Sequence, residues 1–218
     1  MSQITAIEPQ KKKAQRFNIF LDGRFAFGIS DINLLKNNLK IGKKLTEEGI
    51  SKIIAREEIT KLMDIATNYL GYRPRSEKEI VDHLAKKIAD RENIKFQQAQ
   101  ESPLISKVVS SLKKYKYIND LEFAKWYVES RLGSKPRGLI LIKIELKRKG
   151  ISPEIIEKVV SFQKDELSLA QKAVKKKLKR WQNLSSLDLK KKVYQYLSSR
   201  GFDFDTIKET FAYISKKG

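Results

Sequence analysis

The sequence contains no cysteine and only one histidine, His83, in 218 residues. Without cysteine the chain forms no disulfide bonds and performs no thiol chemistry, which is compatible with a cytoplasmic location. With so few nitrogen and sulfur ligands, the common zinc sites and the Ser-His and Cys-His nucleophile systems are nearly excluded. We place His83 on an exposed helix face. The sequence therefore predicts no catalytic residue and no metal site.

Long apolar segments and glycine-rich loops are also missing. No apolar run approaches the ~18 residues that a membrane-spanning helix requires, and the N-terminus lacks the charged and apolar regions of a signal peptide. The dipeptide Gly42-Lys43 is not a phosphate-binding loop, because Asn37 stands where that motif requires a glycine. We therefore expect a protein that is not an enzyme, binds no cofactor, crosses no membrane and works as a monomer.

Acidic residues are few, since 26 Asp and Glu stand against 46 Lys and Arg, and the net charge is +20. A charge of this size informs about partners rather than fold, and it favours nucleic acid, a nucleoprotein or an anionic membrane surface. The plain alternative is a soluble protein with no polyanionic partner. A membrane-surface helix would show bulky exposed apolar residues opposite its lysines, but every apolar face in this sequence is assigned to a core.

The first 30 residues favour β-structure. Two alternating apolar segments, residues 17–21 and 24–29, flank the dipeptide Asp22-Gly23. Asp-Gly in this setting predicts a tight hairpin, because a type I′ turn needs positive φ at both central residues. Residues 4–7 are a candidate third strand. Because two or three strands alone are marginally stable, this sheet is expected to pack on the segment that follows.

The rest of the chain favours helices. Residues 31–41 predict a short helix, and from about Arg56 an apolar pattern of helical period continues to Leu70. We expect Gly71 to end that helix in the left-handed conformation. Residues 88–102 have weak periodicity and are interpreted as an exposed polar extension or loop.

Residues 66–87 have the pattern of a helix, a basic turn and a second helix. Ser76 and Glu79 have the spacing of a capping box at the start of the second helix. Ile80, Leu84 and Ile88 then fall on one face of it. Two arginines on the intervening turn are suited to a phosphate or a carboxylate.

The secondary structure of two later segments is assigned from their local sequence. Residues 139–149 alternate with period two, as a strand does, but they also fit a helical face, with Gly150 at a C-cap and Pro153 in the first turn of the next helix. We choose helix. Residues 179–183 are interpreted as a turn. Helix starts are further predicted at Pro103, Asn119, Ser152, Ser185 or Ser186, and Asp203.

The helical part repeats itself. Residues 146–151 match 197–202 without a gap, and Leu84 of the first copy matches Leu146 of the second. The first copy carries about eleven extra residues, which lie in the polar segment 88–102. The match supports helix for residues 139–149. The predicted fold class is mainly α, with three tandem three-helix repeats in a curved array and a small N-terminal β-hairpin and helix region.

Basic residues recur at equivalent places in these repeats. Arg73-Pro74-Arg75 and Lys135-Pro136-Arg137 occupy the same turn in copies one and two, and basic runs follow at 147–149, 175–180 and 190–192. Solvated helix faces are the plain interpretation, and contact with a polyanion is the functional one. Base stacking by tyrosine or tryptophan is a weaker hypothesis, since such residues on helices are more often core. The candidate contact residues are Tyr72, Arg73, Arg75, Arg131, Lys135, Arg137, Lys147, Arg148, Lys149, Lys179 and Arg180.

Three motifs in order resemble the RecX family, whose members modulate the bacterial recombinase RecA. They are residues 69–80 (Tyr-Leu-Gly-Tyr-Arg-Pro-Arg-Ser-Glu-Lys-Glu-Ile), 117–124 (Tyr-Ile-Asn-Asp-Leu-Glu-Phe-Ala) and 135–138 (Lys-Pro-Arg-Gly). The resemblance covers nearly the whole chain, and the extra residues after Lys87 depart from it. By motif position only, the resemblance implies that Arg73, Arg75, Lys135, Arg137 and residues 147–149 contact the RecA–DNA filament.

The resemblance implies a function. It implies binding along the groove of the RecA–DNA filament and inhibition of strand exchange, ATP hydrolysis and coprotease activity, in the control of DNA repair and the SOS response. The expected partners are the RecA filament and, through electrostatics, single- and double-stranded DNA. The alternative is a basic helical-repeat protein that binds DNA without a RecA target. The expected domains are residues 1–58, 59–118 with the insertion at about 88–102, 119–165 and 166–218.

Overall fold

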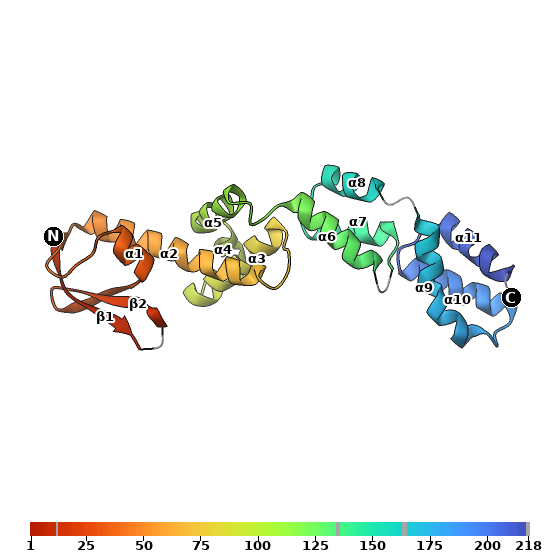
Figure 1. Ribbon diagram of the computed structural model, residues 1–218, viewed down its shortest axis with the longest axis horizontal. Coiled ribbons are helices and arrows are strands. Elements are labelled where there is room, and N and C mark those ends of the chain that lie inside the picture. The colour runs from red at the N-terminus through yellow and green to blue at the C-terminus, as the bar shows by residue number, and fades with distance from the viewer. Residues whose placement is uncertain (12, 134–135, 163–164, 217–218) are drawn as a thin grey trace. The chain divides into compact units, whose positions relative to one another are not determined.

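The computed structural model describes residues 1–11, 13–133, 136–162 and 165–216 (Figure 1). The described residues are mainly helical with a small strand region at the N-terminus, as predicted, and that region has four strands. They divide into two compact units. The first contains residues 1–71 and 81–111, and the second contains residues 72–80 and 112–218. The domain bounds expected from the sequence stay a prediction.

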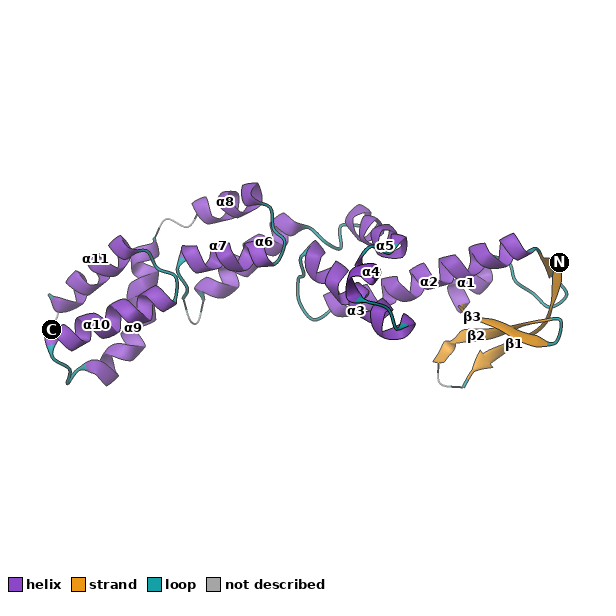
Figure 2. Cartoon of the chain, turned by 180° about the vertical axis from the view of Figure 1, so that it is seen from behind, coloured by secondary structure: helices purple, strands orange, loops and turns teal. Residues whose placement is uncertain are grey.

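The N-terminal sheet is antiparallel, with the strand order β3-β2-β1-β4 (Figure 2). Strands β1 (Ser2–Gln10), β2 (Lys13–Leu21) and β3 (Arg24–Ser30) include the predicted hairpin and the candidate third strand. Asp22 and Gly23 have φ values of 49° and 82°, as the predicted tight turn requires. Strand β4 (Lys44–Leu45) pairs with the start of β1 and was not predicted. Two residues are too few to show alternation.

One face of this sheet packs on helix α2, a single helix over Glu47–Leu70. The shared core contains the fully buried Ile4, Ile19 and Ile29. Helix α1 (Asp31–Lys36) is shorter than the predicted 31–41, because Asn38 takes a positive φ of 46° just after it. Burying apolar side chains against a helix gives the short strands the stability that they lack alone.

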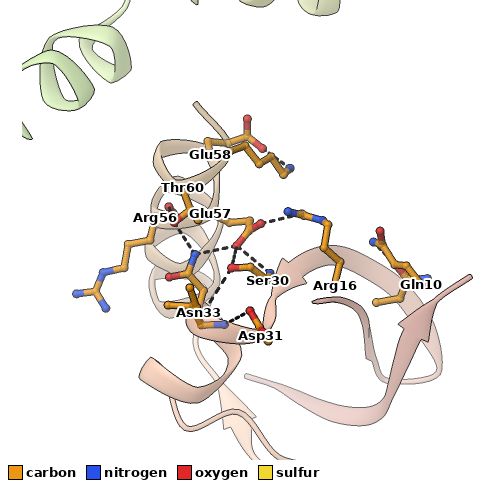
Figure 3. Close-up of polar contacts among 12 residues, drawn as sticks. Gln10, Arg16, Ser30, Asp31, Asn33, Arg56, Glu57, Glu58 and Thr60 are labelled. Carbon is orange, nitrogen blue, oxygen red and sulfur yellow. Dashed lines mark hydrogen bonds and ion pairs between the residues drawn. The ribbon is translucent and has the colours of Figure 1, made fainter. Parts of the chain in front are cut away.

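A buried carboxylate joins the sheet to these two helices (Figure 3). The side chain of Glu57 in α2 is only 2% exposed, and Arg16 of β2 lies 2.7 Å from it. Its Oε2 accepts hydrogen bonds from the amide and hydroxyl of Ser30 at 3.1 and 3.0 Å and from Asn33 at 2.8 Å. Burial alone would raise the pKa of Glu57, but these hydrogen bonds and the charge of Arg16 lower it overall.

Two sequence predictions in the first repeat are wrong. Gly71 has a φ of −58° at the end of α2, so it is not left-handed. The segment 88–102 is not an extension or loop, because α3 (Glu77–Glu92) continues through its start and α4 (Phe96–Gln100) follows. Ala99 is fully buried, and the Gln100 amide donates to Asp82 at 2.8 Å. Polar side chains of this segment thus form hydrogen bonds to other residues of the repeat. The apolar residues of the segment therefore show little helical periodicity in the sequence.

Three helices form the second repeat. They are α6 (Asp120–Leu132), α7 (Leu139–Arg148) and α8 (Pro153–Ser161), and they follow α5 (Pro103–Lys114) in the chain. The choice of helix for residues 139–149 is confirmed, and Gly150 ends α7 with a φ of 80°. The core gathers around Phe123, Ile142 and Leu146, which are at most 1% exposed.

The third repeat has the same plan. It comprises α9 (Glu166–Trp181), α10 (Ser186–Ser199) and α11 (Phe204–Ser215), around a core that includes Val174, Val193 and Leu197. The predicted turn at 179–183 starts too early, because α9 continues to Trp181 and therefore includes Lys179 and Arg180.

The same kind of hydrogen bond occurs at two junctions between successive repeats in the second unit. The amide of Glu77 in α3 donates to Asp120 of α6 at 2.8 Å, and the amide of Leu139 in α7 donates to Glu166 of α9 at 2.9 Å. In each case a carboxylate at the start of the next repeat satisfies a free amide in the first turn of a helix.

The same junctions bring backbones together. The hydroxyl of Ser76 donates to the carbonyl of Lys149 at 2.7 Å, and the amide of Gly138 donates to the carbonyl of Arg200 at 2.9 Å. A Cβ on Gly138 would collide with the backbone of Gly201. The glycine of the second basic turn is therefore needed for close approach rather than for ligand contact.

The Glu57 cluster gives the first prediction. Glu57→Ala leaves the guanidinium of Arg16 and three donors unpaired in a buried place, so we expect the local stability of the first unit to fall by roughly 3–5 kcal/mol. Native-state hydrogen exchange of the β2 and β3 amides measures this loss. The control Glu48→Ala removes the exposed pair with Lys52, which contributes about 0–1 kcal/mol. Equal protection in both variants would contradict the prediction.

Candidate functional site

The first basic turn is tied to a carboxylate at its own repeat junction. Arg73 makes a two-pronged ion pair with Glu79, with distances of 2.8 and 3.1 Å. Lys149, from the end of α7, reaches the same carboxylate at 2.6 Å. The Arg73 guanidinium also lies over the ring of Trp126, 5.7 Å from its centroid. Two cations thus share one half-buried acid.

The capping box predicted at Ser76 is present, and the same acid completes it. The amide of Glu79 donates to the Ser76 hydroxyl at 3.2 Å, and the Ser76 amide donates to the Glu79 carboxylate at 3.3 Å. Burial opposes ionisation of this carboxyl, but hydrogen bonds and charges from Arg73 and Lys149 outweigh it and lower its pKa from 4.5 to about 2.

The second basic turn is tied to Glu145 of α7. Arg131 donates to that carboxylate at 3.0 Å, Arg137 pairs with its other oxygen, and the Tyr127 hydroxyl donates to it at 2.8 Å. Arg131 also lies over the ring of Tyr127, 4.6 Å from its centroid, and Lys149 lies 5.5 Å from the same centroid. The second repeat therefore holds an ordered group of cations around Tyr127 and Glu145, and Lys149 of this group also pairs with Glu79 of α3.

These contacts divide the predicted contact residues into two groups. Arg73, Arg131, Arg137 and Lys149 make internal ion pairs, so much of their charge is compensated within the protein. Such partly buried pairs fix the local geometry, because breaking one leaves the other charge uncompensated. Lys135 lies outside the described residues.

The second group faces solvent. Tyr72 is 86% exposed, and Lys147 and Arg148 are exposed at the end of α7. Arg75 lines a hollow of about 470 Å³ together with Lys113 and Lys116. Exposed cations and a hydrogen-bonding aromatic residue are the groups that an external partner can reach. The two arginines of the first turn thus lie in different surroundings, since Arg73 is bound to Glu79 and the half-buried Arg75 lines this hollow.

The third repeat carries a basic pocket that the candidate set largely missed. Five cations line a hollow of about 320 Å³, namely Lys172, Lys176, Lys177, Arg180 and Arg200. Among the described residues that line it there is no carboxylate. Its remaining walls are Pro136, Ala173 and Tyr196. Of these cations only Arg180 is in the candidate contact set, although Lys176 and Lys177 lie in the basic run 175–180. The spacing 172, 176, 180 places three of them on one face of α9, and that spacing is visible in the sequence.

An aromatic ring supports two of these cations. Arg200 lies 4.8 Å and Lys177 lies 5.6 Å from the ring centroid of Tyr196. Arg200 also donates to the carbonyl of Pro136 at 3.4 Å, and its buried Nε has no hydrogen-bond partner among the described residues. A ring holds cations in place without neutralising them, so the pocket keeps its positive charge.

The remaining candidate features are His83, groups of possible metal ligands and membrane-spanning helices. His83 stacks on Tyr69 with 3.9 Å between ring centroids and is half-buried, so its expected place on an exposed face is wrong. Within the ranges that the structure describes, there is no group of three His, Cys, Asp or Glu side chains that could hold a metal ion. Within the same ranges, no helix is long and apolar enough to span a membrane.

Comparison with protein families gives four matches in chain order. The Regulatory protein RecX N-terminal domain matches residues 2–46, and the first, second and third RecX three-helix domains match residues 63–95, 119–160 and 164–211. These matches follow the order of the sheet and the three repeats in the structure.

Individual proteins give a concordant result. Regulatory protein RecX of Bacillus subtilis (strain 168) is 38% identical over 210 residues, which cover 95% of this chain and 75% of that protein. The protein of the same name from Listeria monocytogenes serovar 1/2a is 34% identical over 208 residues, with 94% and 73% covered. This chain therefore spans about three quarters of these relatives.

Two solved structures have a similar fold. A crystal structure of regulatory protein RecX superposes with a TM-score of 0.69 and 26% identity, covering 96% of this chain and 98% of that one. The crystal structure of RecX from Lactobacillus salivarius gives 0.60 and 25%, covering 73% and 98%.

The pKa of Glu79 gives the second prediction. A carboxyl whose pKa is lower in the folded protein contributes stability above its unfolded pKa, and this contribution is lost as the pH falls. From 4.5 to about 2 the shift corresponds to about 3 kcal/mol. We expect the second unit to lose that much between about pH 5 and pH 2. Denaturant unfolding at each pH, followed by Trp126 fluorescence in a Trp181→Phe background, measures it.

The control for this titration is Glu79→Gln. The glutamine does not titrate, so the variant is less stable near neutral pH and its stability falls less steeply with acid than that of the wild type. Parallel pH profiles for the two proteins would show that Glu79 is not the group responsible. Trp126 is a suitable reporter because it contacts Arg73, the partner of Glu79.

Proposed function

Because this chain belongs to the RecX family of regulatory proteins, we propose that it binds the RecA–DNA filament and inhibits the recombinase, ATPase and coprotease activities of RecA. Its role would then lie in the control of DNA repair and the SOS response. The observation that carries this proposal is the match of the sheet and of all three repeats, in order, to RecX domains. We further propose that the protein acts as a monomer in the cytoplasm, by binding alone and without a reaction of its own.

The charge of the molecule supports a nucleoprotein target. A net charge of +20 favours association with a polyanion and speeds the encounter with it. The exposed candidates Tyr72, Lys147 and Arg148, together with Lys179 and Arg180, are the side chains that we propose to touch the filament. The paired residues Arg73, Arg131, Arg137 and Lys149 hold the repeats in the geometry that presents those side chains.

A plain DNA-binding repeat protein is the second candidate. The pocket of five cations in the third repeat favours it, because a positive pocket of this kind can bind nucleic acid without a protein partner. The two proposals predict different preferences between RecA-coated DNA and bare DNA. A RecA regulator binds RecA-coated DNA more tightly than bare DNA, whereas a plain DNA-binding protein binds bare DNA at least as well.

The third prediction concerns RecA-dependent ATP hydrolysis on single-stranded DNA. We expect the full chain to lower this activity, and to do so less well as salt is raised, because each neutralised phosphate contributes about 0.7 to 0.9 to the log–log salt slope. Binding to RecA-coated and to bare DNA is measured at the same salt concentrations. Affinity that does not change with salt, or that is no greater for the coated DNA, would contradict the proposal.

Two matched double variants locate the contact. Lys147→Gln with Arg148→Gln removes two exposed charges at the end of α7, and Lys107→Gln with Lys158→Gln removes two exposed charges from α5 and α8. Each exposed ion pair contributes up to about 1 kcal/mol, so the first variant should need roughly tenfold more protein for half inhibition. The second variant should inhibit nearly as well as the wild type. Equal losses would remove Lys147 and Arg148 from the contact surface.

A further inference from the structure

The second and third repeats can be compared residue by residue. Gly150 and Gly201 end the middle helices of the two repeats with φ values of 80° and 82°, and this aligns Glu145 with Tyr196 and Lys149 with Arg200. The two junction carboxylates, Asp120 and Glu166, align the first helices in the same way. They pair Arg131 with Lys177 and Tyr127 with Ala173. The contacts agree, because Arg131 reaches Glu145 and Lys177 reaches Tyr196.

The two carboxylates that pair with the cations of the second repeat, Glu145 of α7 and Glu79 of α3, have no acidic counterpart at the equivalent places around the third repeat. Glu145, which holds Arg131 and Arg137, is replaced by Tyr196. The junction register that pairs Glu77 with Leu139 also places Leu141 where the previous junction has Glu79. The cations persist as Lys177 and Arg200, but their internal acids do not.

The third repeat also has a smaller side chain at the centre of the equivalent group. Tyr127 fills the centre of the cationic group in the second repeat, and its counterpart Ala173 is a wall of the hollow in the third. The result is a pocket of about 320 Å³ with five cations and no carboxylate in its lining. An anion from outside can therefore occupy the place that a glutamate fills in the second repeat.

The charge around the pocket identifies the kind of anion. From residue 167 to residue 202 the sequence has eight lysines and two arginines against one acid, Asp188. Such a continuous excess suits a chain of regularly spaced charges better than a single acidic side chain. The ring of Tyr196 already carries Lys177 and Arg200, so it holds cations rather than stacking on a base.

We propose that this pocket binds a backbone phosphate of single-stranded nucleic acid, whereas the equivalent cluster of cations in the second repeat is neutralised by Glu145 and Glu79. The inference rests on the proposed function, in which the target contains DNA, and it assigns the DNA contact to α9 and α10. Recognition is of phosphate, so the base sequence has little influence. Strands of different composition are expected to bind with similar affinity.

The test is fluorescence anisotropy of the full chain with a labelled oligothymidylate and no RecA. Lys172→Gln with Lys176→Gln removes two cations of the pocket, and the matched control Lys175→Gln with Lys192→Gln removes two exposed cations of the same repeat that do not line it. We expect roughly a tenfold loss for the pocket pair, because hydrogen bonds to charged groups are lost. The control should lose about twofold, through net charge alone. The salt slope of the pocket pair should fall by about 0.7 per phosphate.

A second pair of variants restores the acid of the second repeat. Tyr196→Glu places a carboxylate among Lys177 and Arg200, and Tyr196→Gln is the neutral control. We expect the glutamate variant to bind the oligonucleotide at least tenfold more weakly than the glutamine variant. Thermal unfolding and circular dichroism of both variants check that the repeat is folded.

The outcomes separate this inference from the proposed function. Equal losses for the pocket and control pairs, or equal binding by the two Tyr196 variants, would overturn the phosphate pocket. If the pocket pair bound the oligonucleotide normally but lost affinity for RecA-coated DNA, the pocket would hold an acidic protein surface and the inference would be wrong. Loss of oligonucleotide binding supports the pocket whether or not RecA ATPase inhibition is seen, and that inhibition tests the proposed function alone.

Discussion

The packing of the second compact unit depends on one kind of contact, in which a half-buried glutamate pairs with two cations. Glu79 takes Arg73 from its own turn and Lys149 from the next repeat, and Glu145 takes Arg131 and Arg137. A chain with such an excess of positive charge would repel itself where repeats meet, unless acids are placed there. Glu79 at a junction and Glu145 within the second repeat compensate these cations, and the cost of burying each carboxylate is offset by several hydrogen bonds.

Backbone geometry adds a second constraint to these junctions. Gly138 must lie against Gly201 without a side chain, and Ser76 binds the carbonyl of Lys149 at 2.7 Å. Both contacts connect the start of one middle helix to the end of the next. The basic turns are thus partly structural motifs, because the residues that make them recognisable also join successive repeats. Their recurrence alone does not establish a contact surface for a ligand.

Most of the fold could be predicted from the sequence, since its patterns are local. Asp22-Gly23 specified the hairpin, Ser76 with Glu79 specified a helix start, and the internal match decided that residues 139–149 are helical. The failures have tertiary causes. Strand β4 exists only because β1 lies beside it, and α4 is stabilised by side-chain pairing that leaves no apolar period.

The candidate site was harder to predict, because charge in a sequence does not reveal which cations are already paired. Arg73 and Arg75 are two residues apart, yet they lie in different surroundings, since Arg73 makes an ion pair with Glu79 and Arg75 lines a hollow beside Lys113 and Lys116. The informative comparison is between repeats, at positions where a cation persists and its acid does not. Tyr196 in the place of Glu145 is such a position, and Ala173 in the place of Tyr127 opens space beside it. Substitutions that would weaken an internal ion-pair cluster are expected where the missing anion is supplied by a partner.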